Sequence, residues 1–477
     1  MKLKFFMMKK LFSLLILTAC VFSGTAQNKY EIRVKVDGLK DTIANMAYYY
    51  GKSQYYKDTA QVNSKGEMIF SKVDTLEEGM YSILVGRTKV FDFLIDEQKL
   101  SFETTKDHPI NDMKAKGGAE NQIFFEYLKF LNVRQKSASE LKQIQKENDK
   151  ESEEYKEAEA ELEKLNSEVK EFKAEFFKSI DGSFTHSFLK ALESPEIPEV
   201  PKLENGAEDS MFAYKYYRDH FFDGFNFTDE RLVRTAAFHE KIVFYMDRLR
   251  SQDPDSLIVG ADFLLNKTEG GPENFKYTLN YLTSKYERSK NMGMDAVFVH
   301  LAKNYYMKGK APWMTAKQLE KLSERANALD PLLIGKKAPN IIVKDIAQEK
   351  FISLYDVKSK YTVVYIWSAN CGHCKEATPK LKKLYDKMKD QGVEVFGVGS
   401  EFDNEDWKKF IIKHDINFIN GSDGGKFKSD FRDTYDVYST PQTYLLDENK
   451  VILSKKMDID SLEKILEFFI KKDQENY

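Results

Sequence analysis

The segment that most constrains the fold is an uninterrupted apolar run, Tyr361–Trp367, followed four residues later by Cys371-Gly372-His373-Cys374. A run of this kind is typical of a strand that is buried on both faces, at the centre of a parallel sheet. Apolar residues then recur with helical spacing, which predicts a helix from about Cys371 to Asp390. The C-x-x-C motif is therefore expected at a junction between a buried strand and a helix.

The use of cysteine indicates redox chemistry. The chain has 3 cysteines, and Cys20 lies in an N-terminal segment that we expect to be cleaved or lipidated. The thiols of the folded part then all belong to one C-x-x-C pair. This spacing lets the pair close a disulfide across one helical turn and open it again. The outer thiol can be a nucleophile of low pKa, and the inner thiol can resolve the mixed disulfide.

The N-terminus has the pattern of an export signal. Lysines precede an apolar run, residues 11–22, which small residues follow up to Ala26. This order predicts a secretory signal peptide over residues 1–26. The segment Leu17-Thr18-Ala19-Cys20 also resembles a bacterial lipobox, an alternative route that would leave Cys20 as a lipid anchor. Both routes predict export to the periplasm or cell envelope, and no later segment is long and apolar enough to form a transmembrane helix.

Charge and ligand content exclude two classes of function. The formal net charge is −3, so no basic field favours a nucleic-acid partner. A structural zinc site needs further Cys or His ligands at suitable spacing, and no second Cys pair or His pair is present. We therefore expect neither a metal site nor a nucleic-acid interface.

Periodicity predicts a multidomain chain, with a β domain over residues 28–115, a helical domain over 118–332 and an α/β domain over 333–477. Short alternating strands separated by glycine turns predict a small antiparallel β-sandwich-like domain at the N-terminus. These strands are expected at Tyr30–Val36, Glu67–Phe70, Tyr81–Val85 and Val90–Ile95.

The central region is expected to be all-α. A seam with heptad spacing predicts one helix of an antiparallel helical hairpin, with a preceding helix as its partner. The seam residues are Tyr155, Ala158, Leu162, Leu165, Val169, Phe172 and Phe176. The proline-rich segment Ser194–Pro201 is expected to break the helices. A cluster of aromatic residues between Tyr214 and Phe227 fits either a helical core or a peptide-binding groove, and the core is the commoner arrangement.

Four features of residues 333–477 resemble the thioredoxin-like fold, and within it the exported thiol–disulfide reductases of the TlpA and ResA type. They are the opening Gly335-Lys336-Lys337-Ala338-Pro339, the segment from Trp367 to Cys374, Pro379, and Thr440-Pro441 before a strand. The N-terminal region resembles a β domain that precedes thioredoxin-like domains in exported Bacteroidetes proteins. The segment Asp58–Val62, the turn at Gly66 and Phe70 carry that resemblance.

The resemblance implies a role for each residue of the site. Cys371, at a helix N-terminus that favours a thiolate, would attack the substrate disulfide, and Cys374 would resolve the mixed disulfide. His373 and Gly372 would tune the redox potential, although His373 also fits a solvated spacer. Thr440, Pro441 and Trp367 would bind the substrate, with Thr440-Pro441 as the cis-proline turn that faces the cysteine pair.

Three positions depart from the patterns of these families. Asn370 stands where relatives often have Trp directly before the first cysteine. Tyr365 occupies the position of the buried Asp of thioredoxins, and Ala377 occupies that of the Glu of ResA-type proteins. The sequence therefore does not identify the proton acceptor of Cys374, for which water, Glu376 and Lys375 are candidates.

These features predict a protein-disulfide reductase of the cell envelope that needs no cofactor. Its partners would be protein substrates with disulfides or thiols and a membrane thiol-transfer electron donor. The alternatives are a thiol oxidase or disulfide isomerase, since Cys-Gly-His-Cys is also the isomerase pattern, and an envelope binding protein with an accessory redox domain. A peroxiredoxin would need Pro and Thr where the chain has Val364 and Ser368.

Overall fold

The structure, a computed structural model, describes residues 30–401, 405–424 and 431–475. The predicted signal peptide and the lipidation of Cys20 fall outside these residues. Within the described part, no helix combines the length and the apolar character needed to cross a membrane. The chain divides into two compact units, one formed by residues up to 245 with 268–274 and the other by residues 246–267 with 275–477. The division falls inside the helical region, and each unit is described by itself.

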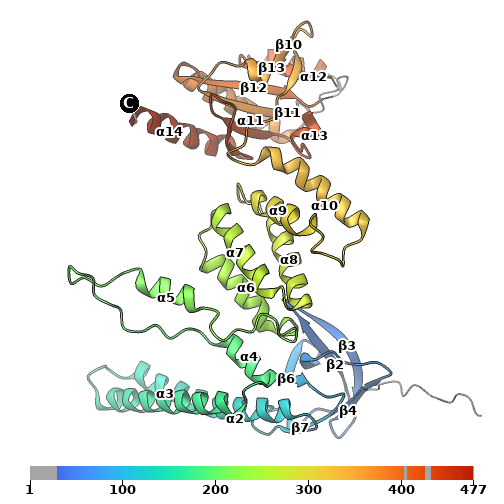
Figure 1. The fold of residues 1–477 in the computed structure, drawn as a ribbon, viewed down its shortest axis with the longest axis vertical. Coiled ribbons are helices and arrows are strands. Elements are labelled where there is room, and N and C mark those ends of the chain that lie inside the picture. Colours follow the sequence, from blue (N-terminus) through green and yellow to red (C-terminus); the bar gives the residue numbers. More distant parts are fainter. Residues whose placement is uncertain (1–29, 402–404, 425–430, 476–477) are drawn as a thin grey trace, which may run out of the picture. The chain divides into compact units, whose positions relative to one another are not determined.

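The first unit begins with two four-stranded sheets that form the expected sandwich-like domain (Figure 1). One sheet has the order β4-β1-β7-β8, made of Glu67–Lys72, Tyr30–Asp37, Lys99–Thr105 and Lys114–Lys116. The other has the order β3-β2-β5-β6, made of Ser53–Val62, Thr42–Tyr50, Gly79–Val85 and Thr88–Ile95. The rings of Phe93 on β6 and Phe102 on β7 lie 4.9 Å apart, so the two sheets pack their inner faces together.

One detail of the sandwich differs from the expectation of an antiparallel domain. Strand β1 pairs antiparallel with β4 but parallel with β7, with Ile32 opposite Leu100. The inward residues of β1 alternate along the strand, as the sequence pattern predicts, and Ile32, Val34 and Val36 are buried. Alternation reports which face of a strand is buried and not the direction of its neighbour, so the parallel pair could not be read from it.

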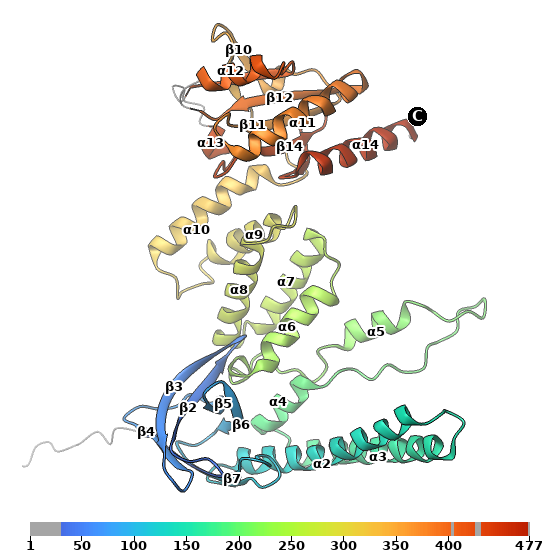
Figure 2. The ribbon, with the colours of Figure 1, turned by 180° about the vertical axis from the view of Figure 1, so that it is seen from behind.

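The predicted helical hairpin is confirmed. Helix α2, Ala119–Glu147, and helix α3, Glu153–Ser179, lie side by side in Figures 1 and 2. Ser152 caps α3 by accepting from the N–H of Tyr155. The rings of Phe130 and Phe172 stack at 3.6 Å across the two helices. The heptad seam of α3 therefore faces α2.

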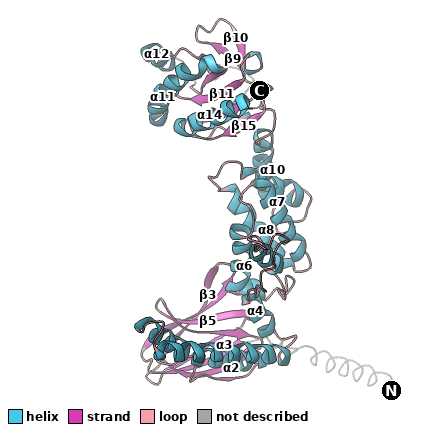
Figure 3. Ribbon diagram, turned by 90° about the vertical axis from the view of Figure 1, so that its left-hand side faces the viewer, coloured by secondary structure: helices cyan, strands magenta, loops and turns pink. Residues whose placement is uncertain are grey.

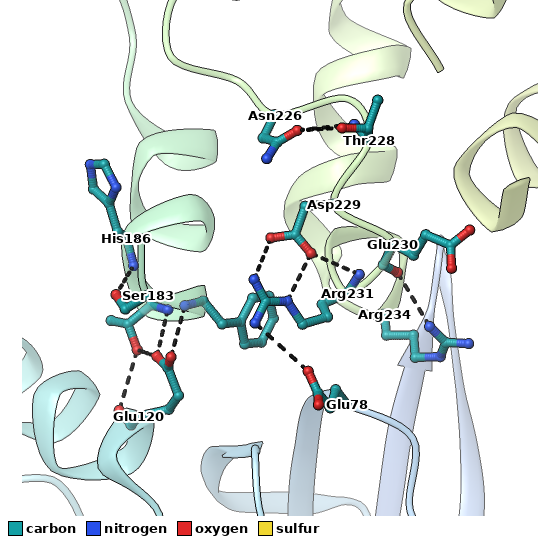
Figure 4. A network of polar contacts seen from close by, with 12 residues as sticks. Glu78, Glu120, Ser183, His186, Asn226, Thr228, Asp229, Glu230, Arg231 and Arg234 are labelled. Carbon is teal, nitrogen blue, oxygen red and sulfur yellow. Dashed lines mark hydrogen bonds and ion pairs between the residues drawn. The ribbon is translucent and has the colours of Figure 1, made fainter. Parts of the chain in front are cut away.

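Polar contacts attach the next helical segments to the rest of the first unit (Figure 4). The carboxylate of Glu120 on α2 accepts hydrogen bonds from the N–H groups of Phe184 and Thr185, at 2.8 and 2.7 Å, at the start of helix α4, Phe184–Leu192. Arg231 forms a bidentate pair with Asp229 at 2.7 and 2.8 Å and reaches Glu78 beside β5 at 3.7 Å. The contacts of Glu120 with α4 and of Arg231 with Glu78 join residues that are far apart in the sequence.

The aromatic cluster is divided between the core and the surface, so it fits the core arrangement only in its second half. Helix α5, Phe212–His220, precedes Phe221, Phe225 and Phe227, which are all buried, whereas Tyr214 on α5 is exposed. The proline-rich segment before α5 contains no helix, as predicted. Helix α6, Ala236–Arg248, follows.

The second unit contains helices and the thioredoxin-like domain. The helices are α7, Pro254–Thr268, α8, Pro272–Glu287, α9, Asp295–Leu301, and α10, Ala316–Leu329. Thr315 and Gln318 form a capping box at the start of α10. Lys455, buried on the sheet of the thioredoxin-like domain, pairs with Asp295 of α9 at 2.5 Å and donates to the carbonyl of Leu332 at 2.6 Å.

The thioredoxin-like domain is a seven-stranded mixed sheet of order β10-β9-β13-β12-β11-β14-β15, with helices against it (Figure 3). The strands are β9, Ile342–Asp345, β10, Phe351–Ser353, β11, Tyr361–Trp367, β12, Val393–Gly399, β13, Ile419–Ser422, β14, Gln442–Leu446, and β15, Ile452–Lys455. The helices are α11, Gly372–Met388, α12, Glu405–Lys413, α13, Phe431–Thr434, and α14, Ile459–Glu475. Strand β11 is parallel to β12 and antiparallel to β14.

Successive residues of β11 enter two different hydrophobic cores, one on each face of the sheet. Val363 and Tyr365 pack in a core with residues of α11, α12 and α14. Val364 and Ile366 pack in a second core with Phe431 of α13. Burial on both faces explains why β11 is an uninterrupted apolar run. The predicted fold class is confirmed, and the exact domain boundaries at 28–115, 118–332 and 333–477 stay predictions.

Candidate active site

The C-x-x-C motif lies where the central strand passes into helix α11. Strand β11 ends at Trp367, and Cys371 is the N-cap residue of α11. The carbonyl of Cys371 accepts from the N–H of Lys375 at 3.1 Å, so the helix is formed from its first residue. The N–H groups of a first helical turn have no partners within the helix, and the helix dipole is positive there. The motif therefore begins where a negative charge is stabilised.

Cys371 is the accessible thiol of the pair. It is partly exposed, and its Sγ donates to the carbonyl oxygen of Thr440 at 3.2 Å. Partial burial acts to raise the pKa of this thiol. Hydrogen bonds to the sulfur from the Thr440 side chain and from the backbone of the first helical turn outweigh that effect, so the pKa lies below its ordinary value. Cys371 is thus the better nucleophile at neutral pH.

Cys374 is fully buried, one turn into the helix. The N–H of Ser368 donates to its Sγ at 3.4 Å. Desolvation dominates its titration and raises its pKa to about 12, although the hydrogen bond from Ser368 acts in the other direction. Both cysteines are free thiols, so the structure corresponds to the reduced pair.

The loop opposite the cysteines carries the Thr440-Pro441 segment, whose peptide bond is cis. Thr440 and Pro441 are partly exposed, and β14 begins directly after them at Gln442. Asp436, earlier in this loop, pairs with Arg325 of α10. The same guanidinium lies 5.2 Å from the ring centre of Tyr438, which is 84% exposed. The segment that faces Cys371 is therefore anchored to a helix outside the sheet.

The remaining predicted site residues divide into exposed and buried positions. His373 and Gly372 are exposed, and nothing lies within 4 Å of a Cβ added to Gly372. The expectation that Trp367 binds substrate is wrong, because its indole is fully buried between Trp407 and Phe410 in the core. Trp367 is the last residue of β11, a strand buried on both faces, and its buried side chain supports the loop that leads to Cys371.

Two features around Cys374 were missed in the sequence. The hydroxyl of Tyr365 shares a hydrogen bond with Thr378 at 2.9 Å, so the position of the thioredoxin Asp holds a neutral pair. The carboxylate of Glu401 is buried and accepts a hydrogen bond from the N–H of Ala369 in the loop before Cys371. A signal for Glu401 existed, because it follows the predicted strand at 393–398. Parallel strands end at the same edge of a sheet, where sites form.

Together, the seven-stranded sheet, the dithiol at the N-terminus of α11 and the facing proline loop define a thioredoxin-like redox domain. The profile of the AhpC/TSA family matches residues 334–455. The profile of a domain of unknown function, DUF5106, matches residues 135–330.

Part of the chain is similar to proteins that carry names. The thiol-disulfide oxidoreductase ResA of Bacillus thuringiensis subsp. konkukian is 30% identical over 138 residues, which are 29% of this chain and 78% of ResA. A solved domain of a "possible thiol-disulfide isomerase" from Cytophaga hutchinsonii is 39% identical, with coverage of 31% of this chain and 99% of that domain and a TM-score of 0.29. The thioredoxin domain of a thiol-disulfide oxidoreductase from Bacteroides vulgatus is 31% identical, with coverage of 29% and 97% and a TM-score of 0.27. The chain belongs to the ResA family of thiol-disulfide oxidoreductases.

Proposed function

We propose that this protein reduces disulfides of other proteins in the cell envelope through the Cys371–Cys374 pair. The observation that carries the proposal is the asymmetry of the two thiols. Cys371 is accessible and has a lowered pKa, whereas Cys374 is fully buried and has a pKa of about 12. An attacking thiol needs thiolate at neutral pH, and a resolving thiol needs protection from other oxidants.

The reaction has two exchange steps. The thiolate of Cys371 attacks one sulfur of a substrate disulfide, so a mixed disulfide forms and the other substrate sulfur leaves as a thiolate. Cys374 loses its proton and attacks the sulfur of Cys371. The mixed disulfide breaks, the second substrate thiolate leaves, and Cys371 and Cys374 become oxidised. A membrane thiol-transfer donor then returns two electrons to the pair, and the exchange itself uses no metal or organic cofactor.

The substrate would bind along the loop that faces Cys371. Thr440 and Pro441 are partly exposed and adjoin the attacking sulfur, since Cys371 Sγ contacts the Thr440 carbonyl. The backbone of Thr440 would pair with an extended substrate segment. Pro441 has no N–H and leaves the approach to Cys371 free. The exposed Gly372 and His373 would tune the redox potential from the solvent side.

Export rests on the sequence of the first 26 residues, with Cys20 as the alternative lipid anchor. Removal of residues 1–26 should leave the protein in the cytoplasm. Radiolabelled palmitate should be incorporated into the wild-type protein only if Cys20 is lipidated. Recovery of the truncated chain from the cell envelope would contradict the proposed signal.

Mixed-disulfide trapping tests the enzymatic proposal. Cys374→Ser should accumulate disulfide-linked complexes with envelope proteins, because Cys371 can attack and nothing resolves the product. Cys371→Ser is the matched control and should trap none. Complexes that form through Cys374 in the control would reverse the two roles. A double Cys→Ser variant that kept the cellular function would instead favour a binding protein with an accessory redox domain.

Disulfide isomerisation is the second candidate function. The Gly372-His373 dipeptide favours it, because a positive charge on His373 beside the attacking sulfur would stabilise the thiolate and make the disulfide a stronger oxidant. Scrambled ribonuclease distinguishes the two functions. An isomerase restores ribonuclease activity from the scrambled protein, whereas a reductase leaves it reduced and inactive unless an oxidant is added.

A further inference from the structure

The carboxylate of Glu401 is a buried acidic group that the reaction described so far does not use. Glu401 follows strand β12 and is 8% exposed. Its Oε1 accepts from the N–H of Ala369, and its Oε2 is buried without a hydrogen-bond partner among the described residues. A buried carboxylate oxygen without a partner is costly, and such groups are concentrated at functional sites.

Glu401 and Cys374 contact consecutive amides of the same loop. The N–H of Ser368 donates to the Sγ of Cys374 at 3.4 Å, and the next N–H, that of Ala369, donates to Glu401. Ser400 fixes the loop from the same side, since its N–H and its hydroxyl donate to the carbonyl of Trp367 at 2.9 and 3.2 Å. Glu401 is therefore held against the turn that positions the buried thiol.

The other charged and titratable groups around this turn already have partners of their own. Arg432 of α13 donates to the backbone carbonyls of Ser400 and Glu401 at 3.1 and 3.5 Å and pairs with Asp423 at 3.2 Å. The hydroxyl of Tyr365 on β11 is bonded to Thr378.

The candidates from the sequence lie on the other side of the helix. Glu376 and Lys375 are both exposed on α11, whereas Cys374 points into the core. Ala377 has no group that binds a proton. Among the described residues that contact the cysteine loop, Glu401 is thus the carboxylate on the buried side.

We propose that the carboxylate of Glu401 accepts the proton of the Cys374 thiol in the resolving step. The inference rests on the proposed function and supplies its missing base. As the S–H bond of Cys374 breaks, an O–H bond forms on Glu401 and a disulfide bond forms between Cys374 and Cys371. The bond from Cys371 to the substrate sulfur breaks, and its electron pair leaves with the substrate thiolate. When the donor reduces the pair, Glu401 returns the proton to Cys374.

The test separates the two exchange steps with Ellman's reagent, 5,5′-dithiobis(2-nitrobenzoate), on the full chain. Attack by Cys371 releases one thionitrobenzoate, and resolution by Cys374 releases the second, so stopped-flow absorbance gives a rate for each step. Glu401→Gln is the informative variant, because the amide oxygen can still accept from Ala369 but cannot take a proton. Glu401→Asp keeps the acid, and Glu376→Gln is the matched control on the exposed face of α11.

With Glu401→Gln we expect the first release to be unchanged and the second to slow about 100-fold at pH 7. Its rate should then rise about tenfold per pH unit, whereas the wild-type rate should depend less steeply on pH. Glu401→Asp should recover part of the rate, and Glu376→Gln should match the wild type.

Two results would overturn the inference. One is a wild-type rate and pH profile in Glu401→Gln. The other is a slow second release in Glu401→Ala together with a normal release in Glu401→Gln, which would assign Glu401 only the hydrogen bond to Ala369. If the wild type itself released no second thionitrobenzoate, the proposed function would fail together with this inference.

Discussion

The difference between the two thiols predicts how they react with an alkylating agent. Cys371 is partly exposed with a pKa below its ordinary value, and Cys374 is fully buried with a pKa of about 12. The perturbation is a short exposure of the reduced protein to iodoacetamide at a series of pH values. Only thiolates react, so the rate for each cysteine follows its thiolate fraction.

The expected ratio of rates follows from these pKa values. At pH 7 a thiol of pKa about 9.0 is about 1% thiolate, and Cys371 exceeds this fraction because its pKa lies below that value. At the same pH Cys374 is about 0.001% thiolate, on the basis of its pKa of about 12. The more basic thiolate is intrinsically more nucleophilic, by about 20-fold for a Brønsted coefficient of about 0.45. Cys371 should therefore react at least about 50-fold faster, and burial of Cys374 adds to this ratio.

The pH dependence has a defined sign for each residue. The rate for Cys371 should rise with pH and level off below the pH at which an ordinary cysteine does, because its pKa is lowered. The rate for Cys374 should continue to rise about tenfold per pH unit well above pH 9, because its pKa is raised.

Mass spectrometry of the two labelled peptides measures both rates in one sample, and the single Cys→Ser variants assign them. Unfolding in urea is the control, and there both cysteines should react alike. Equal labelling of the two cysteines in the folded protein at pH 7, or faster labelling of Cys374, would refute the assignment of attacking and resolving thiols.

Two further predictions concern the supports of the site. Gly399→Ala should lower the free energy of unfolding by about 1–3 kcal/mol in urea denaturation, because the new Cβ would lie 2.7 Å from the buried indole of Trp407. Gly372→Ala is the control, because no atom lies within 4 Å of its new Cβ, and it should change the free energy of unfolding by less than about 0.5 kcal/mol. Arg325→Gln should cost about 1–3 kcal/mol, since the Asp436 side chain, 4% exposed, loses its charged partner. A double-mutant cycle with Asp436→Asn that gave no coupling energy would contradict the second prediction.

The sequence predicted those parts of the fold that depend on local pattern. Strand β11 and helix α11 have strong periodicities, and the strand–helix junction places Cys371 at an N-cap without any tertiary information. The error on Trp367 arose because a family role was given to a residue whose own segment, apolar on both faces, already indicated burial. Strand pattern and resemblance conflicted there, and the pattern was correct.

The remaining features depend on contacts between distant residues. The parallel pairing of β1 with β7 joins residues such as Ile32 and Leu100, and strand alternation carries no information on partner or direction. The burial of Glu401 depends on its contact with Ala369, and that of Asp436 on Arg325. Charged residues are ordinarily expected at the surface, so only the folded chain distinguishes these carboxylates from solvated ones.

The reduction potential of the Cys371–Cys374 pair tests the central claim most directly. Equilibration of the protein against glutathione or dithiothreitol buffers, with the Cys374→Ser variant as a control that forms no intramolecular disulfide, gives the potential. A reductase requires a reversible two-electron couple at about −270 mV or below, as in thioredoxin. A potential at about −180 mV or above would contradict the proposed reductase activity and favour isomerase activity. The absence of a reversible couple in the wild type would contradict the proposal that the protein is a thiol–disulfide enzyme.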